Sequence, residues 1–543
     1  MSGFDWKKSL IKRSFLEPLA VLLIFTYLSF HNAWLSDDSF ISFRVLDHFV
    51  NGFGLRWNIA ERVQAFTNPL LVLLLSPFYY SYQNIVFWSF FSSFCFGLTT
   101  LYFLRKMAAS SVAYWIGIGF LFSSRSFVDY SYSGLENSLN YLIEASFFYL
   151  YFKKEEDPNS SKLPTLVLLA SLGLVSRIDF LLIFLLPLIF LFVKEWKERR
   201  INPTFFFRLL ISASPAILWF LFSAVYYGSL LPNTYYSKTN VADSLFHTLR
   251  QGSRYYFYEF KWDPIVFLFL PTVLLLRSIL KKKVTYYWAA LGFSLPYLIY
   301  ILFVGGDFMA GRFFTYVILL FGIAIVRTES LGKKEIYLLS SILIIYNIAL
   351  SSTPIHTIRQ QAKQNPWLLG REEIADEKLW YYPATGLSWY KKSDSILSNL
   401  AKKKPFFPPS QENVFIKYNT GVIGFFLPTE YIIDIVALGD PLLARIKGKG
   451  RVGHKIRHLP LGYFESVGSG ENRISDPQLK EYYDSIILLT RGDLLDERRW
   501  GAFWEFQFGS KRKYIGPYSI DVDREKKMWA EEIRKKNQGI NEI

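Results

Sequence analysis

The sequence predicts a polytopic α-helical membrane protein that continues into a soluble C-terminal α/β domain. Of its 543 residues, 51% are hydrophobic and 19% are aromatic, and the apolar residues occur in long blocks. Many of these blocks approach the roughly 20 residues that a helix needs to cross a bilayer. Lysine and arginine fall in short clusters between the blocks, so membrane topology explains the net charge of +16 better than nucleic-acid binding does. We therefore expect membrane lipids, and no nucleic acid, as partners.

Eleven apolar blocks are expected to cross the membrane. They comprise residues 15–34, 85–104, 111–127, 135–152, 163–175, 180–193, 205–227, 264–280, 285–304, 313–326 and 336–351. The first block follows a basic N-terminus but lacks a small-residue cleavage site, so it is interpreted as a retained signal anchor. The single cysteine, Cys95, lies inside the second block, which leaves no partner for an intrachain disulfide.

Charge predicts which side of the membrane each loop occupies. Six basic clusters lie at residues 7–13, 105–106, 153–154, 194–200, 281–283 and 327–334. With eleven spans all six are cytoplasmic, as the positive-inside rule requires. A further apolar run, 69–80, would split the clusters between the two sides if it crossed, so we expect an interfacial or re-entrant helix on the outer face. The N-terminus is then cytoplasmic, and the residues after 353 lie outside the inner (plasma) membrane.

The division at residue 353 predicts a transmembrane catalytic domain, 1–353, and an extracytoplasmic α/β domain, 354–543. In the second part, three runs have the composition of strands: 414–418, 431–437 and 485–489. In "GDPLLARI", Asp440 can cap a helix that has Pro441 at its first position. The tail from Arg524 onward is expected to be a charged helix.

The first outer loop contains an adjacent acidic pair, Asp37 and Asp38, in "SDDSFISFRVLDHFVNG". The apolar spacing predicts a short helix over 37–50 on the outer membrane surface, capped by Ser36 and ended by the Asn-Gly pair at 51–52. Both acids then occupy the first turn. There they gain about 0.3–1 kcal/mol from the helix dipole and need no other role. Taken alone, the motif favours this structural interpretation.

The other outer loops change that balance, because charged residues gather on the same side of the membrane. The cations are Arg44, Arg177, Lys238 and Arg312, and the acids are Asp37, Asp38, Glu136, Asp179 and Asp307. Each has a structural alternative, such as a turn ion pair for Arg177 with Asp179 or a helix cap for Glu136. Together, and among many aromatic residues, they favour a site for an anionic lipid headgroup that carries a sugar.

Such a substrate defines the chemistry. A sugar on a polyprenyl phosphate leaves behind a stable phosphate, so the site needs cations near the phosphate more than a strong general acid. A carboxylate at the membrane edge can take the proton of the acceptor hydroxyl as general base. Two acids can instead share a divalent metal, Mg²⁺ or Mn²⁺.

Several stretches resemble the motifs of a known family. They are "SDDSFISFR", "GLRWNIAERVQAFTNPL", "SGLENSL", "SRIDFLL", "LPNTYYSK", "VGGDFMAGRFF", "GVIGFF", "IDIVALGDPLLARI" and "RVGHKIRHLPLGYFES", in this order between Trp34 and Ser466. They resemble the GT-C integral-membrane glycosyltransferases, most closely the terminal β-arabinofuranosyltransferase group of cell-wall enzymes. In "SRID", Ile178 replaces the proline that relatives often carry.

The resemblance implies an eleven-span GT-C core with juxtamembrane helices on the outer surface, a polyprenyl-phosphate-linked sugar donor and a periplasmic C-terminal domain. It also implies that the acidic pair is catalytic, with either Asp37 or Asp38 as the base. The residues expected to bind substrate are Arg44, Asn68, Glu136, Arg177, Asp179, Asn233, Tyr235, Tyr236, Lys238, Asp307 and Arg312. The acceptor is a cell-envelope glycan, a glycolipid or a protein.

Two other classes of membrane protein fit the same composition. A lipid-linked-saccharide transporter or flippase would carry ionisable residues and broken helices near mid-membrane, and often inverted repeats. An O-antigen-type ligase would use a large outer loop between late spans. Here the polar residues lie at span ends, and the acidic loop is the first one, so glycosyl transfer is the preferred hypothesis.

Overall fold

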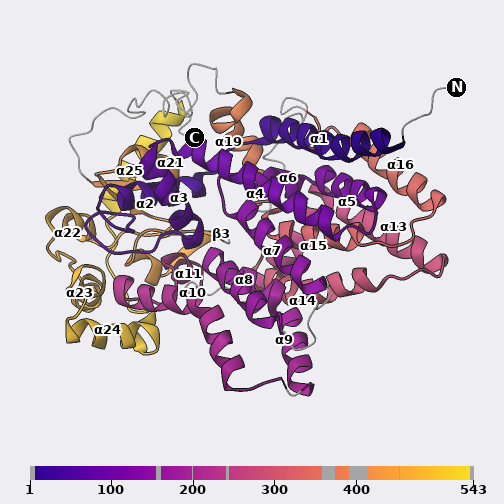
Figure 1. Cartoon of the computed structure of the whole chain (residues 1–543). Helices are drawn as coiled ribbons and strands as arrows, with labels where there is room; N and C mark the ends of the chain where they lie inside the picture. The colour runs from indigo at the N-terminus through magenta and orange to yellow at the C-terminus, as the bar shows by residue number, and fades with distance from the viewer. Residues whose placement is uncertain are drawn as a thin grey trace.

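The computed structural model describes residues 6–153, 161–198, 200–239, 244–356, 374–389, 414–451 and 453–537, and most of them are helical. Figure 1 shows the helical body on one side and the later elements, coloured orange to yellow, gathered around α2 and α3 on the other. Each of the eleven predicted blocks contains a helix.

The helices that occupy the predicted spans form the body of the molecule. They are α1 (Trp6–Asn32), α4 (Ile85–Met107), α5 (Ser111–Ser123), α6 (Arg125–Ser131), α7 (Asn137–Phe152), α8 (Leu163–Ser176), α9 (Leu181–Lys197), α10 (Pro203–Tyr227), α13 (Ile265–Ile279), α14 (Thr285–Val304), α15 (Thr315–Val326) and α16 (Lys333–Ala349). The predicted span 111–127 is divided between α5 and α6, because Ser124 is extended and its side chain caps α6. Every residue of α15 is buried, against α5, α7 and α14, so this helix is the centre of the body.

The lengths and compositions of the helices support a helical membrane protein. They identify fewer membrane-spanning helices than the eleven that the sequence predicts. Among the described residues, α4, α10 and α14 are each long and apolar enough to span a bilayer. Two bent pairs raise the number to five if each pair counts as one span: Leu16–Asn32 with α2 (Asp37–Val50), and α12 (Leu245–Trp262) with α13. The remaining apolar helices are shorter, so the count of eleven stays a prediction.

The helices of the outer loops lie where the chain leaves the body. Helix α2 begins and ends as predicted: the Ser36 side chain accepts a hydrogen bond from the Ser39 N–H, and Asn51 is the C-cap. It turns by 93° from α1. The turn is fixed by backbone hydrogen bonds from Trp34 to Tyr132 (3.0 Å) and from Ser36 to Ser133 (3.0 Å).

Helix α3 (Pro69–Ser81) confirms that the apolar run after residue 68 is helical, and α11 (Asn233–Thr239) is a short helix after α10. The amphipathic helix α12 was not predicted, because residues 239–263 lack an apolar block and were interpreted as an outer loop.

The C-terminal part combines short helices with two small sheets. Its elements are α19 (Glu377–Thr385), β1 (Val414–Lys417), α21 (Gly421–Phe426), β2 (Tyr431–Asp434), β3 (Gly448–Arg451), β4 (His454–Arg457), α22 (Tyr463–Ser469), α23 (Pro477–Arg491), α24 (Glu497–Gln507) and α25 (Val522–Asn537). Short 3₁₀ turns lie at Leu387–Trp389, Leu443–Arg445 and Ser510–Arg512. Two more such turns, Ile178–Phe180 and Arg312–Phe314, lie in the helical body. Strands β1 and β2 are parallel, with Val414 opposite Tyr431, whereas β3 and β4 form an antiparallel hairpin.

Two of the three predicted strands are confirmed as β1 and β2, and the charged tail helix is confirmed as α25. The predicted strand 485–489 is wrong. It lies in α23, where Asp476 caps the helix, a proline follows at its first position, and the apolar residues from Leu479 to Leu489 recur at helical spacing and are buried. The helix expected at Asp440 is only a 3₁₀ turn, although Asp440 accepts the expected capping hydrogen bond from the Leu443 N–H at 2.8 Å.

The hydrophobic cores do not follow the predicted boundary at residue 353. Leu379, Tyr382 and Val422 pack into the same apolar core as the helical body. A second core contains β1, β2, α22, α23 and α24 together with Tyr236 from α11. The C-terminal chain is thus shared between two cores.

Close packing of α12 on α14 gives a test of this architecture. An added Cβ at Gly252 would collide with the Leu302 carbonyl, whereas one at Gly292 would meet nothing within 4 Å. We expect Gly252→Ala to lower the stability by about 1–3 kcal/mol through overpacking. Gly292→Ala should leave it unchanged or raise it by up to about 1 kcal/mol through helix propensity. Thermal unfolding in detergent measures both, and equal melting temperatures would contradict the close contact.

Candidate functional site

Charged side chains from distant parts of the sequence line one cleft at the ends of several helices. The cleft contains about 600 Å³ of empty space, its open mouth included. Its polar lining consists of Asp38, Ser42, Thr67, Asn68, Glu136, Arg177, Thr234, Lys238, Asp307 and Arg312. Seven of the thirteen residues predicted for the site are therefore in its wall.

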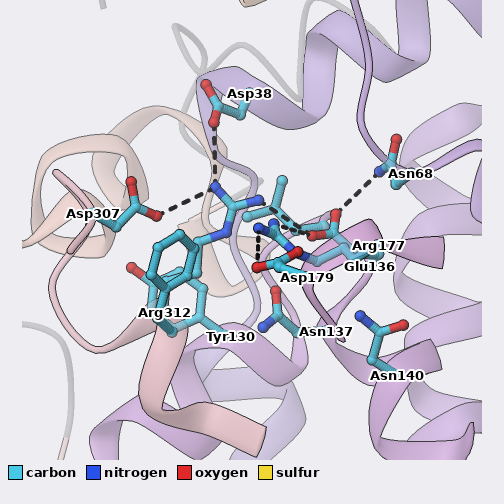
Figure 2. Close-up of polar contacts among 12 residues, drawn as sticks. Asp38, Asn68, Tyr130, Glu136, Asn137, Asn140, Arg177, Asp179, Asp307 and Arg312 are labelled. Carbon is cyan, nitrogen blue, oxygen red and sulfur yellow. Dashed lines mark hydrogen bonds and ion pairs between the residues drawn. The ribbon is translucent and has the colours of Figure 1, made fainter. Parts of the chain in front are cut away.

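Arg312 is at the centre of these charges (Figure 2). Its guanidinium lies 3.4 Å from a carboxylate oxygen of Asp38, 3.3 Å from one of Glu136 and 3.7 Å from one of Asp307. The preceding residue, Gly311, has a φ of +79°, and a Cβ there would collide with Trp262. Only glycine fits this turn, which directs the arginine into the cleft.

Glu136 joins the two arginines of the cleft. One of its oxygens contacts Arg177 at 2.9 Å as well as Arg312, and the other accepts a hydrogen bond from Asn68 at 3.2 Å. The carboxylate of Glu136 is buried, and the two arginines compensate its charge. Glu136 begins α7 without a side-chain capping bond, so its buried carboxylate serves the ion cluster and not the helix.

Arg177 and Asp179 form the predicted turn ion pair. The guanidinium donates to both carboxylate oxygens of Asp179, at 2.8 and 2.9 Å, in the bidentate geometry that makes such pairs strong. A 3₁₀ turn from Ile178 to Phe180 forms the bend at this motif. Arg177 lines the cleft, whereas Asp179 lies outside the lining and holds the Arg177 guanidinium in position.

The two adjacent acids at the start of α2 point in different directions. Both oxygens of Asp37 accept backbone hydrogen bonds from the start of α21: Gly421 at 3.0 Å and Val422 at 2.9 Å. Burial raises the pKa of Asp37 to about 6, although these two bonds oppose the shift. Asp37 does not line the cleft; it fastens α2 to the C-terminal part of the chain.

Asp38 faces the cleft, and its side chain is 25% exposed. Burial raises its pKa, against the opposing charges of Arg312 and Lys238. A raised pKa moves a carboxylate toward the range in which it accepts protons effectively at neutral pH. Of the pair, only Asp38 can meet a bound molecule in this arrangement.

Arg44, expected to bind substrate, lies outside the cleft. Its guanidinium is fully buried and stacks over the Trp57 ring at 4.6 Å. Its donors bond to the backbone carbonyls of Trp57, Gly424, Leu427 and Glu430 at 2.7–3.0 Å. The structure therefore gives Arg44 a structural role: it ties α2 to the segment that follows α21.

Three residues of the "PNTYYSK" motif also point away from the cleft. Asn233 donates to the carbonyls of Ala437, Leu438 and Asp440, at 3.0–3.1 Å, and thus positions α11 on the C-terminal part. The hydroxyl of Tyr235 accepts from Arg512 at 3.0 Å, and that of Tyr236 donates to Gln507 at 2.9 Å. Lys238, from the same helix, does line the cleft.

Sequence reasoning missed Glu377, which lies near the cleft on α19. Burial, together with the nearby charge of Asp38, raises its pKa to about 8. The adjacent residues anchor the segment: Lys378 binds Asp129 at 2.6 Å, and Asp376 binds Arg125 at 2.5 Å. The run Asp-Glu-Lys at 376–378 was the available signal, but it lies in the part interpreted as a separate domain.

The predicted metal alternative would require several ligands to converge on one point of the cleft. In the described ranges, no group of three or more histidine, cysteine or acidic side chains converges as a metal site. The Arg312 guanidinium lies between Asp38 and Asp307, in the position that a bridging cation would take. The residues of the cleft therefore fit an arginine-centred ion cluster, and no chemical step is assigned to a metal here.

No protein-family model, no curated protein and no solved structure matches this chain.

The raised pKa of Glu377 predicts a pH-dependent stability. Between about pH 4.5 and 8 the folded protein keeps a proton that the unfolded chain has lost, so stability falls as the pH rises, by up to about 1.4 kcal/mol per pH unit. Glu377→Gln removes this penalty. We expect the advantage of the variant over the wild type in unfolding experiments to grow from pH 5 to pH 8. Glu481→Gln, at an exposed position, is the matched control. An advantage that is independent of pH would contradict the assignment.

Proposed function

We propose that this protein is a membrane glycosyltransferase of the GT-C type. It moves a sugar from a polyprenyl-phosphate-linked donor to a cell-envelope glycan, glycolipid or protein on the outer face of the inner membrane. The observation that carries the proposal is the orientation of Asp38: a half-buried carboxylate, held by an arginine, faces a cleft at the ends of apolar helices. Its neighbour Asp37 is fully engaged elsewhere.

The reaction needs little from the protein beyond this arrangement. Asp38 accepts the proton of the acceptor hydroxyl as the acceptor oxygen bonds to the anomeric carbon. The bond between that carbon and the phosphate oxygen breaks, and the electron pair leaves with the polyprenyl phosphate. Arg312, 3.4 Å from Asp38, orients the carboxylate. Attack from the face opposite the leaving phosphate inverts the anomeric configuration, which is the default for a general base.

The family resemblance supports the same assignment, since its acidic signature falls on Asp37 and Asp38. The proposal places the N-terminus in the cytoplasm and the C-terminal part outside. It also assigns the first acid of the signature to structure and the second to chemistry, which the sequence left open.

A second function, transport of a lipid-linked saccharide, is favoured by one residue. Glu144, in the middle of α7, is fully buried, and neither of its oxygens has a hydrogen-bond partner among the described residues. Isolated acids inside a helical membrane protein often mark a transport pathway. Glu144 does not line the cleft, however, so the glycosyltransferase proposal accounts for more of the charged residues.

The acidic pair provides the decisive test. Asp38→Asn should purify as a folded protein and lose about a hundredfold to ten-thousandfold of its turnover. Asp37→Asn should retain most of its turnover, with some loss of stability, since Asp37 does not line the cleft and the asparagine oxygen can still accept one of the two hydrogen bonds from α21. The assay follows transfer of labelled sugar from a panel of polyprenyl-phosphate sugars, β-arabinofuranosyl first, to envelope acceptors, with and without EDTA or added Mn²⁺. Near-normal transfer by Asp38→Asn would remove it from the mechanism.

Topology can be tested separately in a Cys95→Ser background. Thr239→Cys and Glu481→Cys should react with a membrane-impermeant maleimide in intact cells, because their loops are assigned to the outer side. Lys283→Cys, in a basic cluster, should react only after permeabilisation. All three positions are exposed in the structure. Reaction of Lys283→Cys alone in intact cells would reverse the orientation.

A further inference from the structure

The two arginines of the cleft are already neutralised. Arg177 and Arg312 lie within ion-pair distance of four carboxylates: Asp38, Glu136, Asp179 and Asp307. Acids therefore outnumber cations in this part of the cleft. A phosphate placed beside Arg312 would meet the negative charge of Asp38 and Asp307 at short range. The inner part of the cleft suits uncharged sugar or acceptor hydroxyls better than a phosphate.

Two other cations lie in the cleft or against its wall, and neither forms a close ion pair among the described residues. Lys238 lines the cleft from α11, and Arg451 ends strand β3 of the C-terminal hairpin. Within the described part of the chain, no acid lies within 4 Å of either charged group. The Arg451 guanidinium lies 5.3 Å from the ring centre of Phe308, a residue of the cleft wall.

The same hairpin brings a histidine to this position. The His454 ring packs edge-on against Phe308, with centroids 4.1 Å apart. Its Nδ1 is buried and has no hydrogen-bond partner among the described residues. Burial lowers the pKa of His454, and the positive charges of Arg451 and Lys238 lower it further.

The hairpin is closely seated on the cleft wall. Gly453, which lines the cleft, has a φ of +80°, and an added Cβ would lie 3.0 Å from the Phe308 ring. Figure 1 shows β3 where the C-terminal elements adjoin the helical body. The cations are thus presented from both parts of the chain, at the junction between them.

We propose that Lys238, Arg451 and His454 form the phosphate subsite of the cleft, and that the β3–β4 hairpin completes the site. The subsite rests on the proposed function for the identity of its ligand, the phosphate of the lipid-linked donor and of the polyprenyl phosphate product. Lysine and arginine supply charge, and His454 offers a ring nitrogen as a further hydrogen-bond donor. Arg312 is thereby assigned to Asp38 and not to the phosphate.

Binding of polyprenyl phosphate to the full-length protein in neutral-lipid nanodiscs tests the subsite without requiring transfer. Arg451→Gln and Lys238→Gln should each weaken binding about 10- to 100-fold, as expected for loss of a charge-assisted contact. Lys449→Gln is the matched control: it removes the same charge from the same strand at an exposed position, and it should bind normally. Arg451→Lys should recover part of the lost affinity.

Control ligands distinguish a lipid-linked phosphate from free phosphate, and the possible outcomes distinguish the subsite from the proposed function. Polyprenol without phosphate should not bind, and inorganic phosphate should compete weakly for the wild type and not for Arg451→Gln. Binding of inorganic phosphate alone would overturn the assignment to the donor. Equal affinity of a folded Arg451→Gln variant and the wild type would overturn the subsite, even if sugar transfer is observed. Loss of lipid-phosphate binding in Arg451→Gln would support the subsite even if no sugar is transferred, in which case only the proposed function fails.

Discussion

The site depends on one buried carboxylate, Glu136, shared by two arginines. A charge removed from water costs several kcal/mol unless it is paired and hydrogen-bonded, so a buried acid requires both arginines and Asn68 to approach it. These partners come from the end of α8, from the loop before α15 and from the start of α3. Because Arg312 also reaches Asp38, the cluster sets the position of α2 above the helical body. Removing either arginine would leave the buried charge of Glu136 less compensated.

The C-terminal part of the chain packs directly against the helices that form the cleft. Asp37 and Arg44 project from α2 and bond to the backbone around α21, more than 370 residues later in the chain. Lys378 and Asp376 fasten the start of α19 to α1 and α6 through Asn32, Asp129 and Arg125. These contacts bring Glu377 and the β3–β4 hairpin to the cleft. A soluble domain attached by a flexible linker would not supply such groups with defined geometry.

The adjacent acids show how helix geometry separates structure from chemistry. Successive residues on an α-helix point about 100° apart, so neighbours in the first turn cannot face the same surroundings. Asp37 therefore meets the amide groups of α21, while Asp38 meets Arg312 and the open cleft. Binding to two amides makes the first acid a fastening point. Partial exposure and a single arginine leave the second free to exchange a proton.

The sequence by itself determined the apolar helices of the body and helix α2, because their signals are local: apolar length and capping residues such as Ser36. It also identified seven of the side chains that line the cleft, since polar groups at helix ends stand out in an apolar chain. Only the tertiary structure decided which predicted residues face the cleft. Asp37, Arg44 and Asn233 turn away because their partners are backbone groups of the C-terminal part, far away in sequence and without a pattern that marks them. For the same reason the structure alone brought Glu377, Arg451 and His454 to the site, and placed 485–489 in a helix, where burial along one face outweighed strand propensity.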